Sequence, residues 1–314
     1  MKLFLQRFFL FAAVVCCLCL PSVGYSRVRI AVIYPQVDQP YAKVFEQIIA
    51  DIRLQKGFEV QTYTLSDNYD PGTVSQWIRK QNAQTLVALG QRGVDIVESL
   101  NMDIPIIVGA VLYASVSQNN LVSGISLTPD PDLLFKHLKQ LAPGIKRVQV
   151  VYNPDRYQWL IDYAKKAASR RGVTIVAREA RDLPSAAPMY RELLADSQQD
   201  NDAVWLLQDS TTVGNSSILP LVLKEAWEKK LVVFSSNPSH VRRGVLFSLY
   251  ADQDAIGRSI TQLLLHQTSG TSKSKGLLPL SDVRIAVNLR TAGHIKLDIP
   301  FEQRRQFDTV YPKR

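Results

Sequence analysis

The polar residues best suited to bind a small molecule follow an apolar run. Residues 203–207 read AVWLL, and Gln208, Asp209 and Ser210 come directly after them. An ionised carboxylate accepts hydrogen bonds from a ligand ammonium, whereas amide and hydroxyl groups can donate to a ligand carboxylate or carbonyl. In open parallel sheets, ligands lie just beyond the carboxyl ends of the strands. The pattern therefore predicts a strand that ends in a binding loop; the alternative is a plain surface loop.

Five other segments share this pattern of an apolar strand that ends in aromatic, amide or hydroxyl side chains. They are residues 34–41, 90–93, 109–117, 152–159 and 235–239. Aromatic walls with a few convergent polar groups are typical of small-molecule sites. The candidate ligand-binding residues, taken from all six loops and from one helix start further along the chain, are Tyr34, Gly90, Gln91, Tyr113, Ser115, Asn153, Tyr157, Gln208, Asp209, Ser210, Asn237 and Asp252.

For a zwitterionic amino acid ligand, these residues would divide the two charges between them. Asp209 is the best-placed carboxylate for a ligand ammonium. Asp252 is second, although capping of the following helix explains it without a ligand. Backbone N–H groups at the helix starts after Gly90 and Asn153 suit a ligand carboxylate, because helix N-termini favour anions. Tyr113 is one of the aromatic rings expected to pack on the ligand side chain.

Sequence motifs for catalysis or cofactor binding do not occur in the chain. There is no G-x-G-x-x-G after the first strand, no P-loop and no G-x-S-x-G. The histidines, which we interpret as surface or capping residues because none has metal-ligand spacing to another, are His137, His240, His266 and His294. We therefore expect a binding protein without metal or cofactor rather than an enzyme. A hydrolase or transferase that uses the same cleft is the alternative.

Residues 1–24 have the composition of a cleaved secretory signal. Lys2 and Arg7 precede an apolar run over residues 8–20, and small residues follow at 22–24. The run is shorter than the roughly 20 residues that a membrane-spanning helix needs, and an uncleaved anchor is the alternative. All three cysteines lie in this run, so a mature chain would contain none. We expect a periplasmic protein without disulfides.

The chain is basic, with 37 Lys and Arg against 28 Asp and Glu and a formal net charge of +9. The basic residues are scattered, with pairs such as Arg242-Arg243. Because an exported protein rarely meets nucleic acid, we interpret these charges as solvated surface and expect no nucleic-acid partner.

Two segments with the same pattern start at Arg27 and Ile145. Each has an apolar strand that ends in Tyr and Pro, then a helical stretch that stops at Gly57 or Gly172, then a second β-rich run. Strand–helix alternation predicts a parallel sheet covered on both faces. Its repetition predicts an α/β fold of two similar lobes; one long doubly wound sheet is the alternative. The predicted lobes are residues 25–122 with about 250–278, and residues 123–249 with about 279–314.

Four segments carry a resemblance to a known family. They read PIIVGAV from Pro105, VSGISLTPDPDLLFKHLKQLAPGIKRVQVVYNP from Val122, FSLYADQDAIGRSI from Phe247 and VNLRTAGHIKLDIP from Val287. The chain resembles the periplasmic solute-binding proteins of an ABC-transporter family whose studied members are similar to tryptophan and tyrosine receptors. The resemblance implies the fold of a type I periplasmic binding protein. In that fold two Rossmann-like lobes, joined by three crossovers, close on a ligand by hinge motion.

The function that this resemblance implies is that of an extracytoplasmic receptor. We expect a monomer that hands a small organic solute, for example an amino acid or an aromatic compound, to an ABC permease in the inner membrane. A periplasmic ligand sensor that feeds a membrane signalling protein is the alternative. Two loops depart from the family pattern, at Gly90-Gln91 and at Tyr113-Ala114-Ser115.

Overall fold

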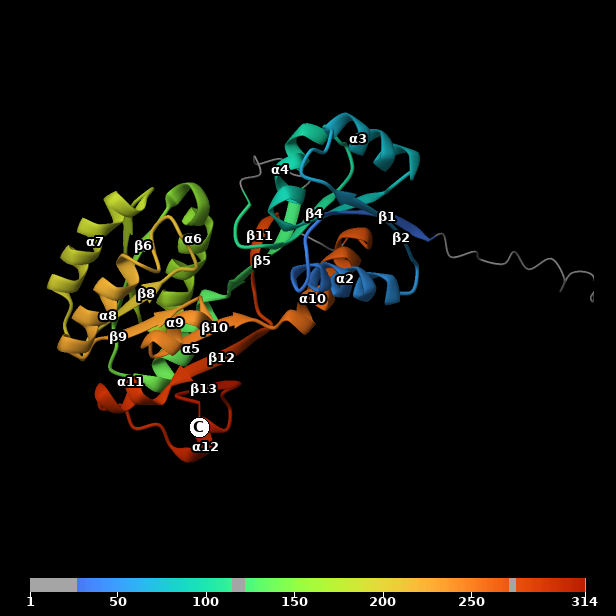
Figure 1. The fold of residues 1–314 in the computed structure, drawn as a ribbon. Helices are drawn as coiled ribbons and strands as arrows, with labels where there is room; N and C mark the ends of the chain where they lie inside the picture. The colour runs from blue at the N-terminus through green and yellow to red at the C-terminus, as the bar shows by residue number, and fades with distance from the viewer. Residues whose placement is uncertain (1–26, 115–121, 271–274, 314) are drawn as a thin grey trace, which may run out of the picture.

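The computed structural model describes residues 27–114, 122–270 and 275–313. Two sheets, each covered by helices, form two lobes that lie side by side (Figure 1). The predicted α/β fold with two mostly parallel sheets is confirmed. The predicted signal over residues 1–24 and the candidate residue Ser115 lie outside the described residues.

The first lobe has a parallel sheet in the order β11-β5-β4-β3-β1-β2. Its strands are β1 (Val28–Pro35), β2 (Phe58–Leu65), β3 (Thr85–Leu89), β4 (Ile106–Val111), β5 (Val122–Pro129) and β11 (Gly276–Leu280). Its helices are α2 (Tyr41–Leu54), α3 (Pro71–Lys80), α4 (Gly90–Leu100) and α10 (Gln253–Thr268). All five residues of β3 are buried, as expected for a strand that is covered on both faces.

Helices α2 and α10 pack together on one face of this sheet. Helix α2 buries Phe45, Ile48, Ile49 and Ile52, whose spacing puts them on a single helix face. In α10, a Cβ on Gly257 would lie 2.2 Å from Oδ2 of Asp51 in α2. The two helices can therefore approach this closely only because residue 257 has no side chain.

The second lobe has a sheet in the order β13-β12-β10-β9-β8-β6-β7, parallel except for the antiparallel pair β10–β12. Its strands are β6 (Arg147–Tyr152), β7 (Thr174–Glu179), β8 (Asp202–Leu206), β9 (Val232–Ser235), β10 (Phe247–Ala251), β12 (Val283–Asn288) and β13 (Thr309–Tyr311). Its longer helices are α5 (Pro131–Leu141), α6 (Pro154–Arg171), α7 (Leu183–Asp196) and α8 (Ile218–Lys229). Its short helices are α9 (Pro238–Arg243), α11 (Leu289–His294) and α12 (Phe301–Arg304).

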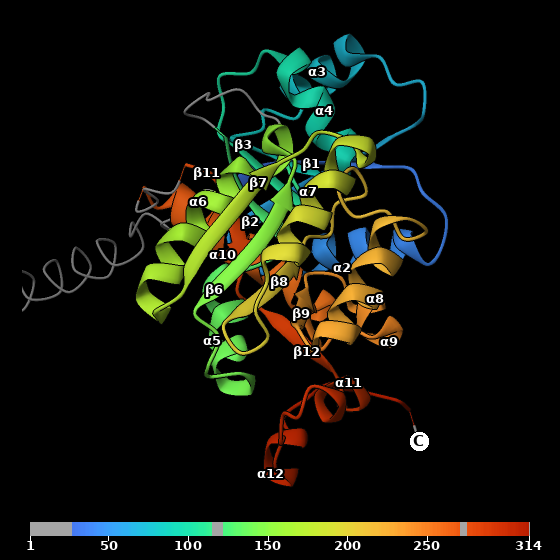
Figure 2. The same ribbon diagram turned by 90° about the vertical axis from the view of Figure 1, so that its left-hand side faces the viewer.

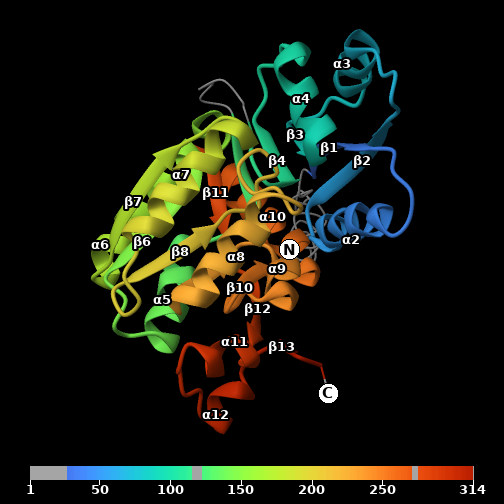
Figure 3. The ribbon, with the colours of Figure 1, turned by 60° about the vertical axis from the view of Figure 1, so that its left-hand side comes forward.

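Helices cover both faces of the second sheet. Helix α6 lies on one side of β6–β8, and α7 and α8 lie on the other (Figure 2). The α5–α6 side contains a layer of large rings in which Trp205 and Phe234 stack with centroids 6.1 Å apart, and Phe135 meets both edge-on. The segment with α11, α12 and β13 lies at the end of this lobe away from the first lobe (Figure 3).

Three crossovers join the lobes, after β5, after β10 and between β11 and β12. Backbone hydrogen bonds tie them together: Asp130 N–H donates to Leu280 O at 2.9 Å, and Asp252 N–H donates to Asp282 O at 3.0 Å. Strand β5 pairs with β4, so the chain leaves the first sheet after Pro129. The predicted lobe boundary at residue 122 lies at the start of β5, whereas the chain leaves the first sheet after β5. An apolar run in the sequence does not reveal which of two sheets the strand joins.

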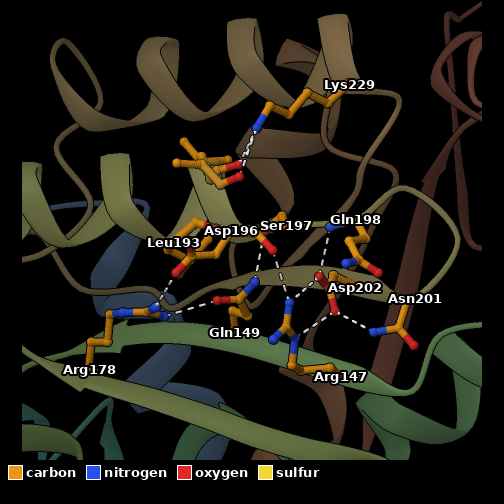
Figure 4. A network of polar contacts seen from close by, with 12 residues as sticks. Arg147, Gln149, Arg178, Leu193, Asp196, Ser197, Gln198, Asn201, Asp202 and Lys229 are labelled. Carbon is orange, nitrogen blue, oxygen red and sulfur yellow. Dashed lines mark hydrogen bonds and ion pairs between the residues drawn. The ribbon is translucent and has the colours of Figure 1, made fainter.

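A buried polar network fastens the start of β6 to the start of β8 (Figure 4). The fully buried Asp202 carboxylate accepts from Nε of Arg147 at 2.7 Å and from Nη2 at 2.5 Å. It also accepts from Gln198 N–H at 2.7 Å and from Asn201 Nδ2 at 2.8 Å. Burial alone would raise the pKa of Asp202, but these hydrogen bonds outweigh it and lower the pKa. This network lies at the opposite ends of the strands from the loops predicted to bind a ligand.

Candidate ligand-binding cleft

A cavity of about 310 Å³ lies where the loop after β4 of the first lobe meets the carboxyl ends of the second sheet. Its size is at the lower end of the range of about 300–1,000 Å³ that small-molecule sites occupy. The first lobe contributes Leu112 and Tyr113. The second lobe contributes Arg156, Tyr157, Leu207, Gln208, Asp209, Ser210, Val213, Asn215, Asn237 and His240. The cavity therefore brings together six of the twelve candidate residues: Tyr113, Tyr157, Gln208, Asp209, Ser210 and Asn237.

The Asp209 carboxylate is used by its own loop. Its Oδ1 accepts from the N–H and Oγ1 of Thr211 at 2.9 and 2.7 Å, and its Oδ2 accepts from Oγ1 of Thr212 at 3.0 Å. The side chain is fully buried. Asp209 thus shapes the loop after β8, as Asp residues do in Asx-turns. The predicted contact of Asp209 with a ligand ammonium stays a prediction, and in this structure its carboxylate is occupied by Thr211 and Thr212.

Arg156 supplies the cation of the cavity, and it was not among the predicted residues. Its Nη1 lies 3.6 Å from Oδ1 of Asp209, and its guanidinium lies 4.7 Å from the centre of the Tyr113 ring. About a third of its side chain is exposed. Within the described residues its guanidinium makes no hydrogen bond at all, although it carries five N–H donors. The sequence could have indicated Arg156 by its position in the first turn of α6, between the candidates Asn153 and Tyr157.

The two tyrosines join the lobes at the cavity wall. The buried Tyr157 hydroxyl donates to Gln208 O at 2.8 Å, which fixes the loop after β8 to α6. Burial, with the nearby Asp209 charge, raises the pKa of Tyr157 well above its usual value, so the hydroxyl remains a donor. The Tyr113 ring lies 6.0 Å from the Tyr157 ring, and Tyr113 packs against the core of the second lobe although it follows a strand of the first.

His240 lines the cavity as a neutral, buried side chain, which corrects its interpretation as a surface or capping histidine. It is 2% exposed, and its Nδ1 lies 2.9 Å from Oγ of Ser235. That hydroxyl donates to Leu206 O at 3.0 Å and accepts from Asn237 N–H at 3.0 Å. Ser235 is completely buried and its hydrogen bonds are used, so the Ser235–His240 pair holds the loop after β9 and does not present a nucleophile.

Stability is expected to fall with acid because of His240. Burial, with the charge of Arg243, lowers the pKa of His240 from 6.5 to about 4. The unfolded chain therefore takes up this proton at a higher pH than the folded chain. The contribution of neutral His240 to the free energy of unfolding is complete above pH 6.5. It is lost as the pH falls toward 4, by up to about 3 kcal/mol. Urea unfolding between pH 7 and pH 4 measures this loss. A His240→Gln variant should show a shallower decline, and an equal slope in both proteins would contradict the assignment.

Two further candidates near the cavity are helix caps. Asn153 is buried and its Oδ1 accepts from Asp155 N–H at 3.0 Å at the start of α6. Asn237 accepts from Ser239 N–H at 3.0 Å at the start of α9. The Nδ2 of Asn153 donates to Oγ1 of Thr211 at 3.2 Å, so this residue supports the Asp209 loop. Asn237 is half-buried and lines the cavity while it caps α9.

Tyr34 and Gly90 serve the packing of the first lobe. The Tyr34 ring packs against Phe45 of α2 with centroids 6.2 Å apart. Gly90 is buried with φ +71°, and a Cβ there would lie 3.1 Å from Cζ of Phe45 and from Cγ of Pro35. The glycine thus lets β3 turn directly into α4, and neither residue lines the described cavity.

Gln91 and Asp252 are also engaged away from the described cavity. The exposed Gln91 donates to Asp95 Oδ1 at 2.8 Å within α4. Asp252 caps α10 through Asp254 N–H at 3.3 Å, and its Oδ1 lies 2.8 Å from Nη2 of Arg284. Asp252 is therefore a helix cap in this structure, as the alternative interpretation predicts.

Over residues 27–114, 122–270 and 275–313, no three His, Cys, Asp or Glu side chains gather in the way a metal site requires. In the same residues, no helix is both long and apolar enough to cross a lipid bilayer.

The fold and the cleft define a two-lobed α/β binding protein. The model of a family described as ABC transporter substrate binding protein matches residues 41–293, and the chain belongs to this family. The resemblance seen in the sequence is thereby confirmed. Membership makes the chain a substrate-binding protein of an ABC transporter. Comparison with curated protein sequences gave no match.

Solved structures of similar fold cover nearly the whole described chain. A ligand-free, open substrate-binding protein with adhesive properties from Clostridium difficile is 18% identical with a TM-score of 0.59, over 91% of this chain and 99% of that one. An ABC domain in complex with L-Trp from Streptococcus pneumonia is 17% identical with a TM-score of 0.56, over 91% and 100%. A conserved domain protein from Vibrio cholerae is 20% identical with a TM-score of 0.55, over 90% and 99%. At these identities the likeness shows the fold alone.

Proposed function

We propose that the chain binds a small organic solute with a carboxylate group in the cleft and delivers it to an ABC permease by hinge closure. The observation that carries this proposal is the state of the two charged groups in the cavity. The Asp209 oxygens already accept three hydrogen bonds, whereas the Arg156 guanidinium makes none within the described residues. The cavity therefore offers N–H donors to a ligand anion and no free carboxylate to a ligand cation.

The walls around Arg156 suit the remainder of such a solute. Leu112, Leu207 and Val213 supply apolar surface, and the Tyr113 ring faces the guanidinium. Ser210 and Asn215 are exposed and add hydroxyl and amide groups at the mouth. An aliphatic or aromatic carboxylate that also carries a hydrogen-bonding group matches this lining. L-Trp, which the Streptococcus protein binds, is one member of this class.

A paired thermal-shift screen tests the proposal on the mature protein. Amino acids and aromatic acids are each compared with the corresponding carboxamide, which keeps the shape and removes the charge. A true ligand at a hundred times its Kd stabilises the folded protein by about 2.7 kcal/mol, so its melting temperature rises clearly. We expect stabilisation by acids and little by amides. Equal stabilisation by both forms would contradict the role of the carboxylate and leave a receptor for a neutral solute.

A further inference from the structure

A second cavity lies on the second lobe, between the end of α8, the end of α9, the start of α11 and the end of β13. Its volume is about 720 Å³, more than twice that of the cleft cavity. The two cavities have no lining residue in common. The segment with α11 and β13 lies at the end of the lobe away from the first lobe, so this cavity is distal to the cleft (Figure 3). We call it the distal cavity.

Positive side chains dominate the lining of the distal cavity. Its cations are Lys224, Arg242, Arg243, Arg290 and Lys313, and its one acidic residue is Glu228. All five cations are exposed, and none of them forms an ion pair within the described ranges. The sequence suggested that the Arg242-Arg243 pair was ordinary solvated surface. The structure instead places both residues on the wall of a concave site, together with three cations that are distant in the chain.

Contacts between α8, α9 and α11 join the elements that carry most of these cations. Asn288 Nδ2 donates to Val241 O at 2.8 Å, and Thr291 Oγ1 donates to Gly244 O at 2.9 Å, so the end of α9 is fastened to the start of α11. The Trp227 ring of α8 stacks on His294 of α11 with centroids 3.5 Å apart, so α8 is also joined to α11. These contacts join the helices that carry four of the five cations, and the Arg290 guanidinium lies 5.8 Å from the centre of the Trp227 ring.

Clustered like charges repel one another, and a bound anion would remove this repulsion. Guanidinium groups present a planar fork of donors that matches phosphate oxygens, and three of the five cations are arginines. We propose that the distal cavity is a second binding site that takes a phosphate-bearing anion, either a free di- or polyphosphate or the head group of an anionic lipid. This site is independent of the solute proposed for the cleft.

Titration of the mature protein with inorganic pyrophosphate at low salt tests the proposal. We expect saturable binding, seen by calorimetry and by a change in tryptophan fluorescence, to which Trp227 contributes because it lines the cavity and is 40% exposed. The variant that combines Arg242→Gln, Arg243→Gln and Arg290→Gln should bind at least about tenfold more weakly, because charge-assisted contacts to phosphate are lost. Sedimentation with vesicles of phosphatidylglycerol and phosphatidylcholine, against phosphatidylcholine alone, tests the lipid source.

A matched control removes three exposed cations from the first lobe through Lys43→Gln, Arg53→Gln and Lys56→Gln. This variant has the same change in net charge and should bind pyrophosphate and vesicles within about twofold of the unmodified protein, because it leaves the distal cavity intact. Pyrophosphate binding that only the distal variant loses assigns a free phosphate compound, and vesicle binding that only this variant loses assigns a lipid. Binding of neither probe, or equal losses in both variants, overturns the proposal. So does pyrophosphate binding that Arg156→Gln abolishes, since the anion would then lie in the cleft.

Discussion

Arg156→Gln is expected to weaken binding of a carboxylate solute by about ten- to a hundredfold. Hydrogen bonds to charged groups contribute about 1.5–3 kcal/mol, and each 1.4 kcal/mol is tenfold in Kd. The guanidinium is the cation on the cavity wall, and its position is set by Asp209 on one side and by the Tyr113 ring on the other. Calorimetry with the acid that gives the largest thermal shift measures the effect.

The matched control for this variant is Arg181→Gln. Arg181 lies in the same lobe and its Nε contacts Asp155, but both side chains are about two-thirds exposed. Exposed pairs of this kind contribute about 0–1 kcal/mol, so the solute Kd should not change. If Arg156→Gln and Arg181→Gln bind the solute equally well, Arg156 is not the anchor and the cleft takes its ligand by other contacts.

Asp202→Ala is expected to reduce the free energy of unfolding by about 3–5 kcal/mol, because it leaves the Arg147 guanidinium without its buried partner. The Asp202 carboxylate is fully buried and accepts from three residues, as Figure 4 shows. Urea unfolding at neutral pH measures the loss.

Asp196→Ala provides the comparison in the same network. Its carboxylate is 66% exposed and lies 3.6 Å from Nη2 of Arg178, so the loss should be below about 1 kcal/mol. Because Asp202 lies at the ends of the strands away from the cleft, the solute Kd of the folded Asp202→Ala protein should be unchanged. Equal destabilisation by the two substitutions would show that burial of Asp202 does not set its contribution.

The fold could be predicted from the sequence because strand–helix alternation is a property of long segments. Apolar runs such as residues 203–207, each followed by a helical stretch, leave few arrangements other than a covered parallel sheet. The sheet to which a strand belongs is a different matter. Strands β5 and β12 both carry apolar residues in a short run, but they join different sheets, and their partners are set by crossovers that involve residues far apart in the chain.

The loops of the cleft could also be predicted, whereas the roles of single residues could not. Asx residues at strand ends serve equally as ligand contacts and as helix caps, and both Asn153 and Asn237 are followed by a proline, which favours the cap. The sequence pattern could not show that the Asp209 carboxylate accepts hydrogen bonds from Thr211 and Thr212, so it was interpreted as free. Arg156 was missed because helix starts were considered for their backbone N–H groups and not for their side chains.

The three crossovers also determine the order in which the protein can be completed during synthesis. When the chain has been made as far as Ala251, the first sheet still lacks β11, and α2 still lacks its partner α10. One edge of strand β5 then has no partner strand, and an exposed strand edge can pair with other chains. The second sheet lacks β12 and β13 at the same moment. Each lobe is therefore closed by residues from the last fifth of the chain, and both lobes become mature almost together.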